Sequence, residues 1–267
     1  MIFSRLLPAI GTFALLTACV PADLPTAART LPANSRECPV GAGTGCYFRN
    51  SPVKLQPQKV EIAGRPYVFH PTARSLEFVD GEGRGWTAPI GTLTDGASIP
   101  QIFVPIVGDP RSREFANAAA MHDAWCGIGN EDGPVYHKAT WQEVHRMFYD
   151  SLIVGGTDDV RAKVMFAAVW LGGPRWSPIS RAPDTRLDRL PAELRREAMR
   201  RAKTYIEREN PPIRLLIPYL QEAERGLFQA VAREGSGDQD GTDPNEGSGG
   251  NPSLVSGAPG PVGAVQE

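Results

Sequence analysis

The sequence of 267 residues is long enough for one sizeable folded domain with additional segments. Its 28 lysines and arginines nearly balance its 30 aspartates and glutamates, and the net charge of −2 excludes a strongly basic nucleic-acid-binding protein. The 28 glycines and 25 prolines indicate that part of the chain lies outside regular structure. No apolar run in mid-chain reaches the length of a membrane-spanning helix, which excludes a polytopic helical membrane protein.

The N-terminal residues have the pattern of a bacterial lipoprotein signal. Arg5 precedes an apolar stretch over residues 6–16 that is too short for a stable membrane span but suits a cleaved signal. The following Leu16-Thr17-Ala18-Cys19 resembles a lipobox, in which cleavage leaves the cysteine first and a lipid is attached to it. We therefore predict a signal peptide over residues 1–18 and lipidation of Cys19. The alternative is an ordinary secretory signal followed by a chance cysteine.

A lipid on Cys19 would hold the protein at the membrane of the cell envelope, facing the periplasm, and Val20 is compatible with sorting to the outer membrane. Because the periplasm is oxidising, we expect a disulfide between Cys38 and Cys46, which enclose a glycine-rich loop. Cys126 then remains, and we interpret it as a small buried packing residue.

Composition divides the chain into five regions. After the signal over 1–18, residues 19–37 are rich in proline, alanine and threonine and are expected to form a flexible tether. Residues 38–180 are expected to form the main folded domain, and residues 181–234 add C-terminal helices. Residues 235–267 contain nine glycines, four prolines and no aromatic residue. This tail is expected to stay disordered because it cannot bury enough apolar surface to offset its ordering entropy.

Predicted strands precede predicted helices along the main domain. Segments rich in β-branched and aromatic residues between glycines and prolines predict strands over residues 53–63, 65–69, 75–79 and 86–93. Apolar periodicity between stop signals then predicts five helices, over residues 112 or 113 to 126, 141–154, 158–171, 191–209 and 213–232. This order predicts an α+β fold, with a short, mostly antiparallel sheet followed by a helical bundle, extra C-terminal helices and a disordered tail.

Local signals mark the ends of several predicted helices. Thr140 and Glu143 form a capping box before the second helix. Thr157 is expected to cap the third, and Pro191 is expected to occupy the first position of the fourth. Pro218 is expected to kink or restart the fifth helix.

Two histidines are predicted to point into the helical bundle. His122 shares one face of its helix with Phe115 and Cys126, and His145 shares the apolar face of the next helix with Phe148. Each histidine lies five residues from a helix end, so antiparallel packing would bring the two rings to one level. We interpret them as a shared functional site, and the alternative is two core histidines bonded to backbone. The two other histidines, which we interpret as surface residues, are His70 and His137.

Two aspartates are candidate partners of these histidines. Asp123 follows His122 but points about 100° away around the helix axis, so it would lie at the edge of the site, within reach of a metal or water. Asp95 lies in an Asp-Gly turn, where it could orient a histidine or bind a metal. The structural alternative for Asp95 is a simple Asx-turn.

Several segments resemble the bacterial and phage family known as domain of unknown function 1353. The motifs that carry this resemblance are Thr94 to Pro100 (Thr-Asp-Gly-Ala-Ser-Ile-Pro), His122-Asp123, Glu143 to Tyr149, and Met165 to Gly172. The resemblance extends over about residues 50–175 and implies a small α+β domain, without an established activity. The family usually has Ala-Asp at the position of Val144-His145. This departure argues against an inherited acid–base pair and is compatible with a metal site of His122, His145 and Asp123.

Two functional hypotheses follow. The first is a hydrolase with His122 as the base, oriented or assisted by Asp95, Asp123 and His145, with a divalent metal as a candidate cofactor. The second is a non-catalytic structural or interaction module of the envelope, whose buried polar residues fix the packing. Both place the protein at the membrane through Cys19, and neither involves nucleic acid.

Overall fold

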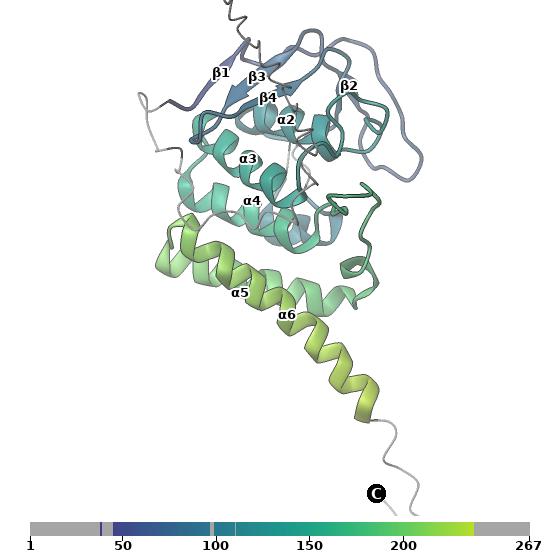
Figure 1. Cartoon of the computed structure of the whole chain (residues 1–267), viewed down its shortest axis with the longest axis vertical. Helices are drawn as coiled ribbons and strands as arrows, with labels where there is room; N and C mark the ends of the chain where they lie inside the picture. Colours follow the sequence, from purple (N-terminus) through teal and green to yellow (C-terminus); the bar gives the residue numbers. More distant parts are fainter. Residues whose placement is uncertain (1–37, 39–44, 97–98, 110, 238–267) are drawn as a thin grey trace, which may run out of the picture. The chain divides into compact units, whose positions relative to one another are not determined.

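The computed structural model describes residue 38 and residues 45–96, 99–109 and 111–237, and these residues have an α+β fold (Figure 1). The predicted signal peptide, Cys19, the tether and the predicted tail from residue 238 onward lie outside the described residues. The described chain up to Phe228 belongs to one compact unit, and Gln229 begins a second. Within the described residues, no helix combines the length and apolarity needed to cross a bilayer.

The strands form two small antiparallel sheets. The three-stranded sheet has the order β1-β3-β4, formed by Tyr47–Arg49, Leu76–Val79 and Gly85–Ala88. The two-stranded sheet pairs β2, His70–Pro71, with β5, Leu93–Thr94. The prediction of a short, antiparallel sheet is therefore confirmed.

The strand predicted over residues 53–63 is wrong. This segment makes only isolated bridges, between Leu55 and Thr72 and between Val60 and Phe69, and residues 65–69 share the second of these. Its residues are exposed or half-buried without a buried face, and Pro57 removes a backbone donor that a continuous ladder would need. Strand β1 was not predicted, since three residues are too short to show a pattern.

The helices of the described chain are α1, Val104–Val107; α2, Ala116–Cys126; α3, Trp141–Val154; α4, Asp159–Gly172; α5, Ala192–Glu209; and α6, Ile213–Gly237. Helices α2 to α6 lie close to their predicted positions. One-turn 3₁₀ helices occupy Gln101–Phe103, Arg113–Phe115 and Leu187–Arg189. The first of these 3₁₀ turns and α1 lie in a proline-interrupted segment that had no helical prediction.

Three details of the helix ends differ from prediction. Asp158, and not Thr157, caps α4, because its side chain accepts a hydrogen bond from the Arg161 N–H at 3.1 Å. Thr157 instead belongs to the preceding turn, where its N–H donates to the Leu152 carbonyl. Pro191 is the residue before α5 rather than its first residue. Helix α6 contains Pro218 without restarting there, and it extends to Gly237, past the predicted end at residue 232.

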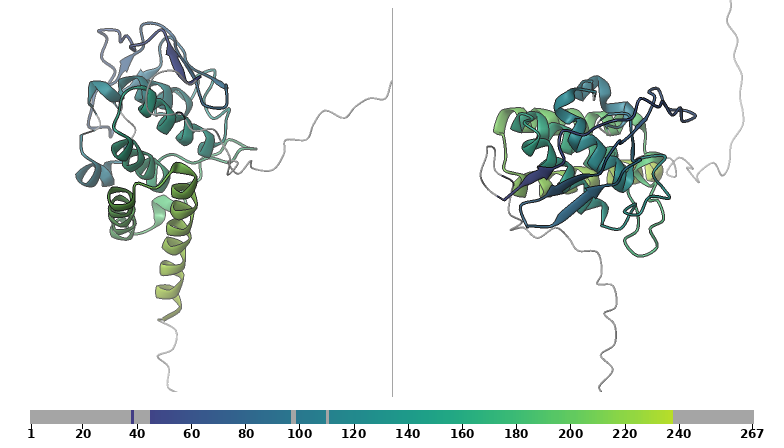
Figure 2. Two further views of the ribbon diagram at one scale, coloured as in Figure 1. Left: turned by 90° about the vertical axis from the view of Figure 1, so that its left-hand side faces the viewer. Right: turned by 90° about the horizontal axis from the view of Figure 1, so that it is seen from above.

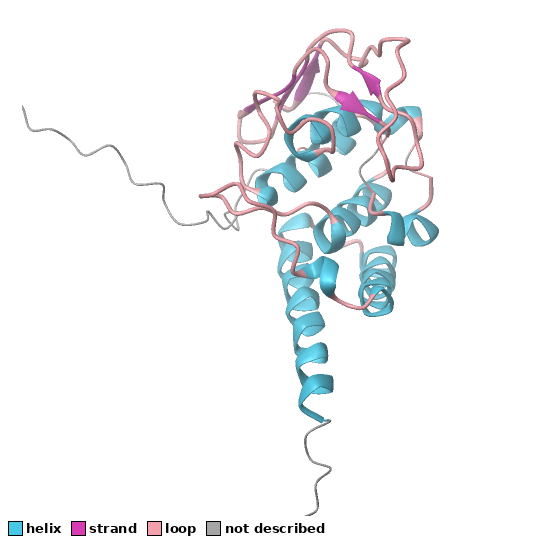
Figure 3. Cartoon of the chain, turned by 90° about the vertical axis from the view of Figure 1, so that its right-hand side faces the viewer, coloured by secondary structure: helices cyan, strands magenta, loops and turns pink. Residues whose placement is uncertain are grey.

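The helices are stacked below the three-stranded sheet. Helix α2 packs against β3 and β4, α3 packs against α2, α4 against α3, and α5 against α4 (Figures 1 and 2). Figure 3 shows the strands grouped together at one end of the compact unit that ends at Phe228. Phe78 and Trp86 of the sheet pack with Met121 of α2 in one core cluster, and Phe148 and Trp170 belong to a second, all-helical cluster. Helices α2 and α3 lie between these clusters, so polar side chains on their facing sides are removed from water.

The predicted disulfide between Cys38 and Cys46 is confirmed. Cys38 is buried in the sheet-side core cluster, and Cys46 directly precedes β1. The bond therefore fixes the start of the described chain to the three-stranded sheet.

Candidate functional site

Helices α2 and α3 bring the two predicted site histidines together. The ring centroids of His122 and His145 lie 5.2 Å apart. Both residues are fully buried, with 0% of their surface exposed. The helical phase that places His122 beside Phe115, and His145 beside Phe148, also directs the two rings into the space between the helices.

Cys126 joins the two histidines. Its Sγ lies 3.4 Å from Nε2 and 3.7 Å from Nδ1 of His122, one helical turn away on α2. One ligand atom from each of His122, Cys126 and His145 can be chosen so that all three atoms lie within 4.8 Å of one another. We call these three residues the His–Cys–His group. The interpretation of Cys126 as a packing residue missed this arrangement, although its i+4 spacing from His122 was visible.

Burial holds all three residues in their neutral forms. Desolvation lowers the pKa of His122 to about 3. Desolvation also lowers the pKa of His145 well below its usual value, and the neighbouring His122 and Arg175 lower it further. The pKa of the Cys126 thiol is raised well above its usual value by burial and then by Asp123. A thiolate–imidazolium pair is therefore disfavoured, and the thiol instead donates to the His122 carbonyl at 3.4 Å.

Aromatic rings enclose the group. The Phe148 ring lies 4.9 Å from the His122 ring, and the Trp141 ring lies 5.4 Å from the His145 ring. Neither ring nitrogen of His145 makes a well-formed hydrogen bond to any described residue. The Pro174 carbonyl is near enough to raise the pKa of His145 slightly against the effect of burial. His145 is therefore a buried imidazole whose polar capacity is at most partly used by the described fold, through the Pro174 carbonyl.

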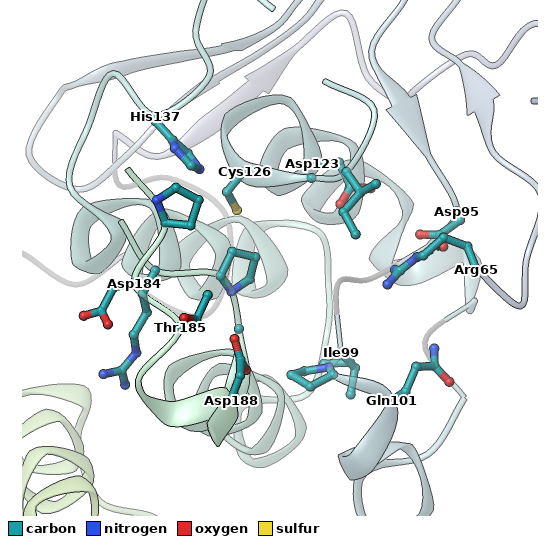
Figure 4. A pocket seen from close by; sticks show the side chains of 18 of the residues that line it. Arg65, Asp95, Ile99, Gln101, Asp123, Cys126, His137, Asp184, Thr185 and Asp188 are labelled. Carbon is teal, nitrogen blue, oxygen red and sulfur yellow. Dashed lines mark ion pairs between the residues drawn. The ribbon is translucent and has the colours of Figure 1, made fainter. Parts of the chain in front are cut away.

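A cleft of about 450 Å³ lies beside the group. Asp123 and Cys126 belong to its wall, whereas His122 and His145 are not among the described residues that line it. Figure 4 shows the Cys126 side chain extending from α2 into this cleft, with Asp123 next to it. Asp123 is 3% exposed. The imidazoles thus lie behind the cleft wall, and Cys126, which contacts His122, is part of that wall.

Asp95 lies on another part of the cleft wall. Its carboxylate forms an ion pair with Arg65 at 3.6 Å, visible in Figure 4. Burial raises the pKa of Asp95, although Arg65 opposes this effect. The structure thus brings Asp95 to the same cleft as Asp123 but not into the His–Cys–His group. The neighbouring residues 97 and 98 of the predicted motif lie outside the described residues.

The prediction that His137 is a surface residue is wrong. Its ring is sandwiched between Tyr136 and Trp176, with centroid distances of 3.9 and 4.0 Å. Its Nδ1 lies 3.1 Å from the Arg181 carbonyl, and burial lowers its pKa. This position depends on a segment some forty residues away in sequence, which a local pattern cannot show. His70 is half-buried in β2.

Comparisons with known proteins find a family similar to the region that contains the site. Residues 72–169 match the family described as "Protein of unknown function (DUF1353)". The chain is 41% identical to the uncharacterized protein y4iH of Sinorhizobium fredii over 99 residues, which are 37% of this chain and 38% of that protein. It is 36% identical to the uncharacterized protein y4jT of the same organism over 116 residues, 43% of this chain and 32% of that protein. No solved structure matches the chain.

The chain spans less than two fifths of the length of these two relatives. The matched region contains Asp95, Asp123 and the whole His–Cys–His group, and it ends before the cleft residues that follow α4. The predicted resemblance is confirmed: residues 72–169 of this chain match the family described as proteins of unknown function DUF1353.

Proposed function

We propose that this protein is a hydrolase of the bacterial cell envelope that acts on a small polar substrate in the cleft beside the His–Cys–His group. The observation that carries this proposal is the position of Asp123, a nearly buried carboxylate on the cleft wall that adjoins Cys126 and follows His122. A carboxylate held at a cleft of this size is suited to proton transfer with a bound substrate.

The base in this proposal is Asp123 rather than His122. An imidazole with a pKa of about 3 is a weak base at neutral pH, and His122 does not line the cleft. Asp123 takes a proton from a water molecule while the water oxygen attacks the electrophilic atom of the substrate. The bond to the leaving group then breaks, and the proton passes from Asp123 to that group. Arg65, paired with Asp95 on the same cleft wall, is available to bind a substrate oxygen.

Replacing Asp123 by asparagine should lower kcat/KM by about 10²-fold or more, because general base catalysis contributes about 10²–10⁴-fold. The full chain would be assayed with 4-nitrophenyl carboxylic esters, phosphate esters and glycosides, and with chromogenic peptide amides. Asp132→Asn, in the exposed loop after α2, is the matched control and should keep the wild-type rate. Absence of turnover in all four substrate classes, or equal rates for wild type and Asp123→Asn, would contradict the proposal.

The alternative is a non-catalytic envelope module. The complete burial of His122 and His145 favours it, because some buried polar residues have no role other than to specify the packing of the core. This alternative predicts that Asp123→Asn has no effect on turnover because the wild type has none.

The proposed location at the envelope rests on the lipobox-like Leu16-Thr17-Ala18-Cys19. Cys19→Ser should leave an unprocessed or soluble protein, because the serine hydroxyl cannot take the thioether-linked lipid. Membrane fractionation and metabolic labelling with palmitate would measure the change, with Cys126→Ser as the control that keeps its lipid. A Cys19→Ser protein that is still acylated and membrane-bound would show that the lipid is attached elsewhere.

A further inference from the structure

We infer that the His–Cys–His group binds one zinc ion between α2 and α3. The group offers two imidazole nitrogens and one sulfur, which are the ligand atoms that zinc prefers in proteins. Ligand atoms at about 2.0–2.3 Å from a tetrahedral zinc ion lie about 3.3–3.8 Å from one another. The 3.4 Å between Cys126 Sγ and His122 Nε2 matches this spacing. All three ligand atoms lie within 4.8 Å of one another, so small side-chain rotations would bring them to this spacing around an ion.

The two helices supply the ligands in a defined way. His122 and Cys126 are four residues apart on α2, so both side chains leave the same face of the helix one turn apart. His145 approaches from α3, which packs along α2. Two ligands come from one turn of α2 and the third from α3. The packing of these two helices therefore sets the geometry of the site, and no ligand lies on a loop.

The second, independent observation concerns the hydrogen bonding of the His145 ring nitrogens. His145 is fully buried, and neither of its ring nitrogens makes a well-formed hydrogen bond within the described part of the chain. Leaving a buried polar group unsatisfied costs about 1–3 kcal/mol, so native structures rarely keep one without a partner. A metal ion bound at one ring nitrogen would supply the missing partner. A histidine that only fills space in the core would not need to lie beside two other ligand atoms.

The charges of the group also suit an ion. Two neutral imidazoles and a thiolate would balance one of the two charges of zinc, and the Cys126 thiol would release its proton as the zinc–sulfur bond forms. Three protein ligands leave a fourth tetrahedral position open, as in zinc sites that bind water. Cys126 lies on the wall of the cleft, from which water could reach that position. The metal site does not depend on the proposed hydrolysis.

Cobalt(II) titration tests the inference directly. The full chain, freed of metal with a chelator, should bind about one equivalent of cobalt with a thiolate-to-cobalt charge-transfer band and ligand-field bands of tetrahedral intensity. Zinc should displace the cobalt and abolish these bands. Cys126→Ser and His145→Ala should weaken cobalt binding more than about 100-fold, since even outer-shell changes cost about 10–100-fold. Elemental analysis of protein purified without chelator should show zinc in the wild type and at most a tenth as much in both variants.

Two controls separate the site from other cysteines and histidines. Cys19→Ser and His70→Ala should keep the spectrum and the zinc content, because neither residue belongs to the group. Thermal melting of Cys126→Ser, a one-atom change, checks that the variant is folded. Wild-type protein without cobalt bands, variants that bind as well as wild type, or copper in place of zinc would each overturn the inference. Cobalt binding without hydrolysis would refute only the proposed hydrolase, and hydrolysis without cobalt binding would refute only the metal site.

Discussion

Replacing Phe148 by alanine should lower the free energy of unfolding by about 3–5 kcal/mol. Phe148 is fully buried on α3 and belongs to the core cluster formed by the helices. Its ring lies 4.9 Å from the His122 ring, so truncation would open a cavity directly behind the His–Cys–His group. The loss combines the transfer energy of the ring with the cost of the cavity, because neighbouring helices can collapse into it only in part.

Urea denaturation followed by circular dichroism would measure this loss. Ile179→Ala is the matched control, since Ile179 is 74% exposed and its truncation should change the unfolding free energy by less than about 0.5 kcal/mol. A loss below about 1 kcal/mol for Phe148→Ala would mean that this side chain is not packed as described. Because the cavity adjoins His122, any functional defect of this variant would be ambiguous, and the ligand substitutions are the better test of the site.

The helical part of the fold was predictable because its signals are local. The capping box illustrates this: the Thr140 side chain accepts from the Glu143 N–H at 3.3 Å, and the Glu143 carboxylate accepts from the Thr140 N–H at 2.9 Å. Both partners are three residues apart, so the start of α3 could be predicted from the sequence. The apolar period of α3 then predicted which face is buried, including His145.

The strands were less predictable because pairing depends on residues far away in sequence. The segment over residues 53–63 has β-forming residues, yet it makes only isolated bridges. Strand β1 is only three residues long and gains its pairing from β3, about thirty residues later in the chain. Sequence patterns report the preference of a segment but not whether a partner edge is available to it.

The candidate site was predictable in outline but not in membership. Helical phase predicted that His122 and His145 face inward, and the structure places their rings next to each other. The helical phase of α2 places Cys126 on the buried face, but a packing residue and a neighbour of both histidines would lie on that same face. The sequence could therefore not distinguish these two roles. The burial of His137 depends on Trp176 and Arg181, which no local pattern connects to it.

A buried ion pair on α3 predicts a second large effect, on the pH dependence of stability. The Asp150 carboxylate accepts from Nε of Arg146 at 3.2 and 3.1 Å, and both residues are buried. Burial raises the pKa of Asp150 from 3.8 to about 7; Arg146 opposes this rise, and the nearby Asp80 adds to it. The folded state therefore holds the Asp150 proton more tightly than the unfolded chain does.

The sign of the effect follows from this difference. Below the ordinary pKa of 3.8 the carboxyl is protonated in both states, and the stability that the raised pKa contributes is fully present. It is lost as the pH rises towards about 7. At about 1.4 kcal/mol per pKa unit, the loss is on the order of 4 kcal/mol. His122 works in the opposite sense: its pKa, lowered from 6.5 to about 3, makes stability fall as the pH decreases through that interval. The wild-type profile alone would therefore mix the two effects.

Comparison with Asp150→Asn isolates the carboxyl, because asparagine has a similar shape and does not titrate. The unfolding free energy of wild type minus that of the variant should fall by about 4 kcal/mol between pH 4 and pH 8, measured by urea denaturation at each pH. The difference between wild type and Ile179→Ala, which adds or removes no titrating group, should stay constant over the same interval. A wild-type minus Asp150→Asn difference that stays flat or rises with pH would mean that Arg146 outweighs burial and that the pair is fully ionised in the folded protein.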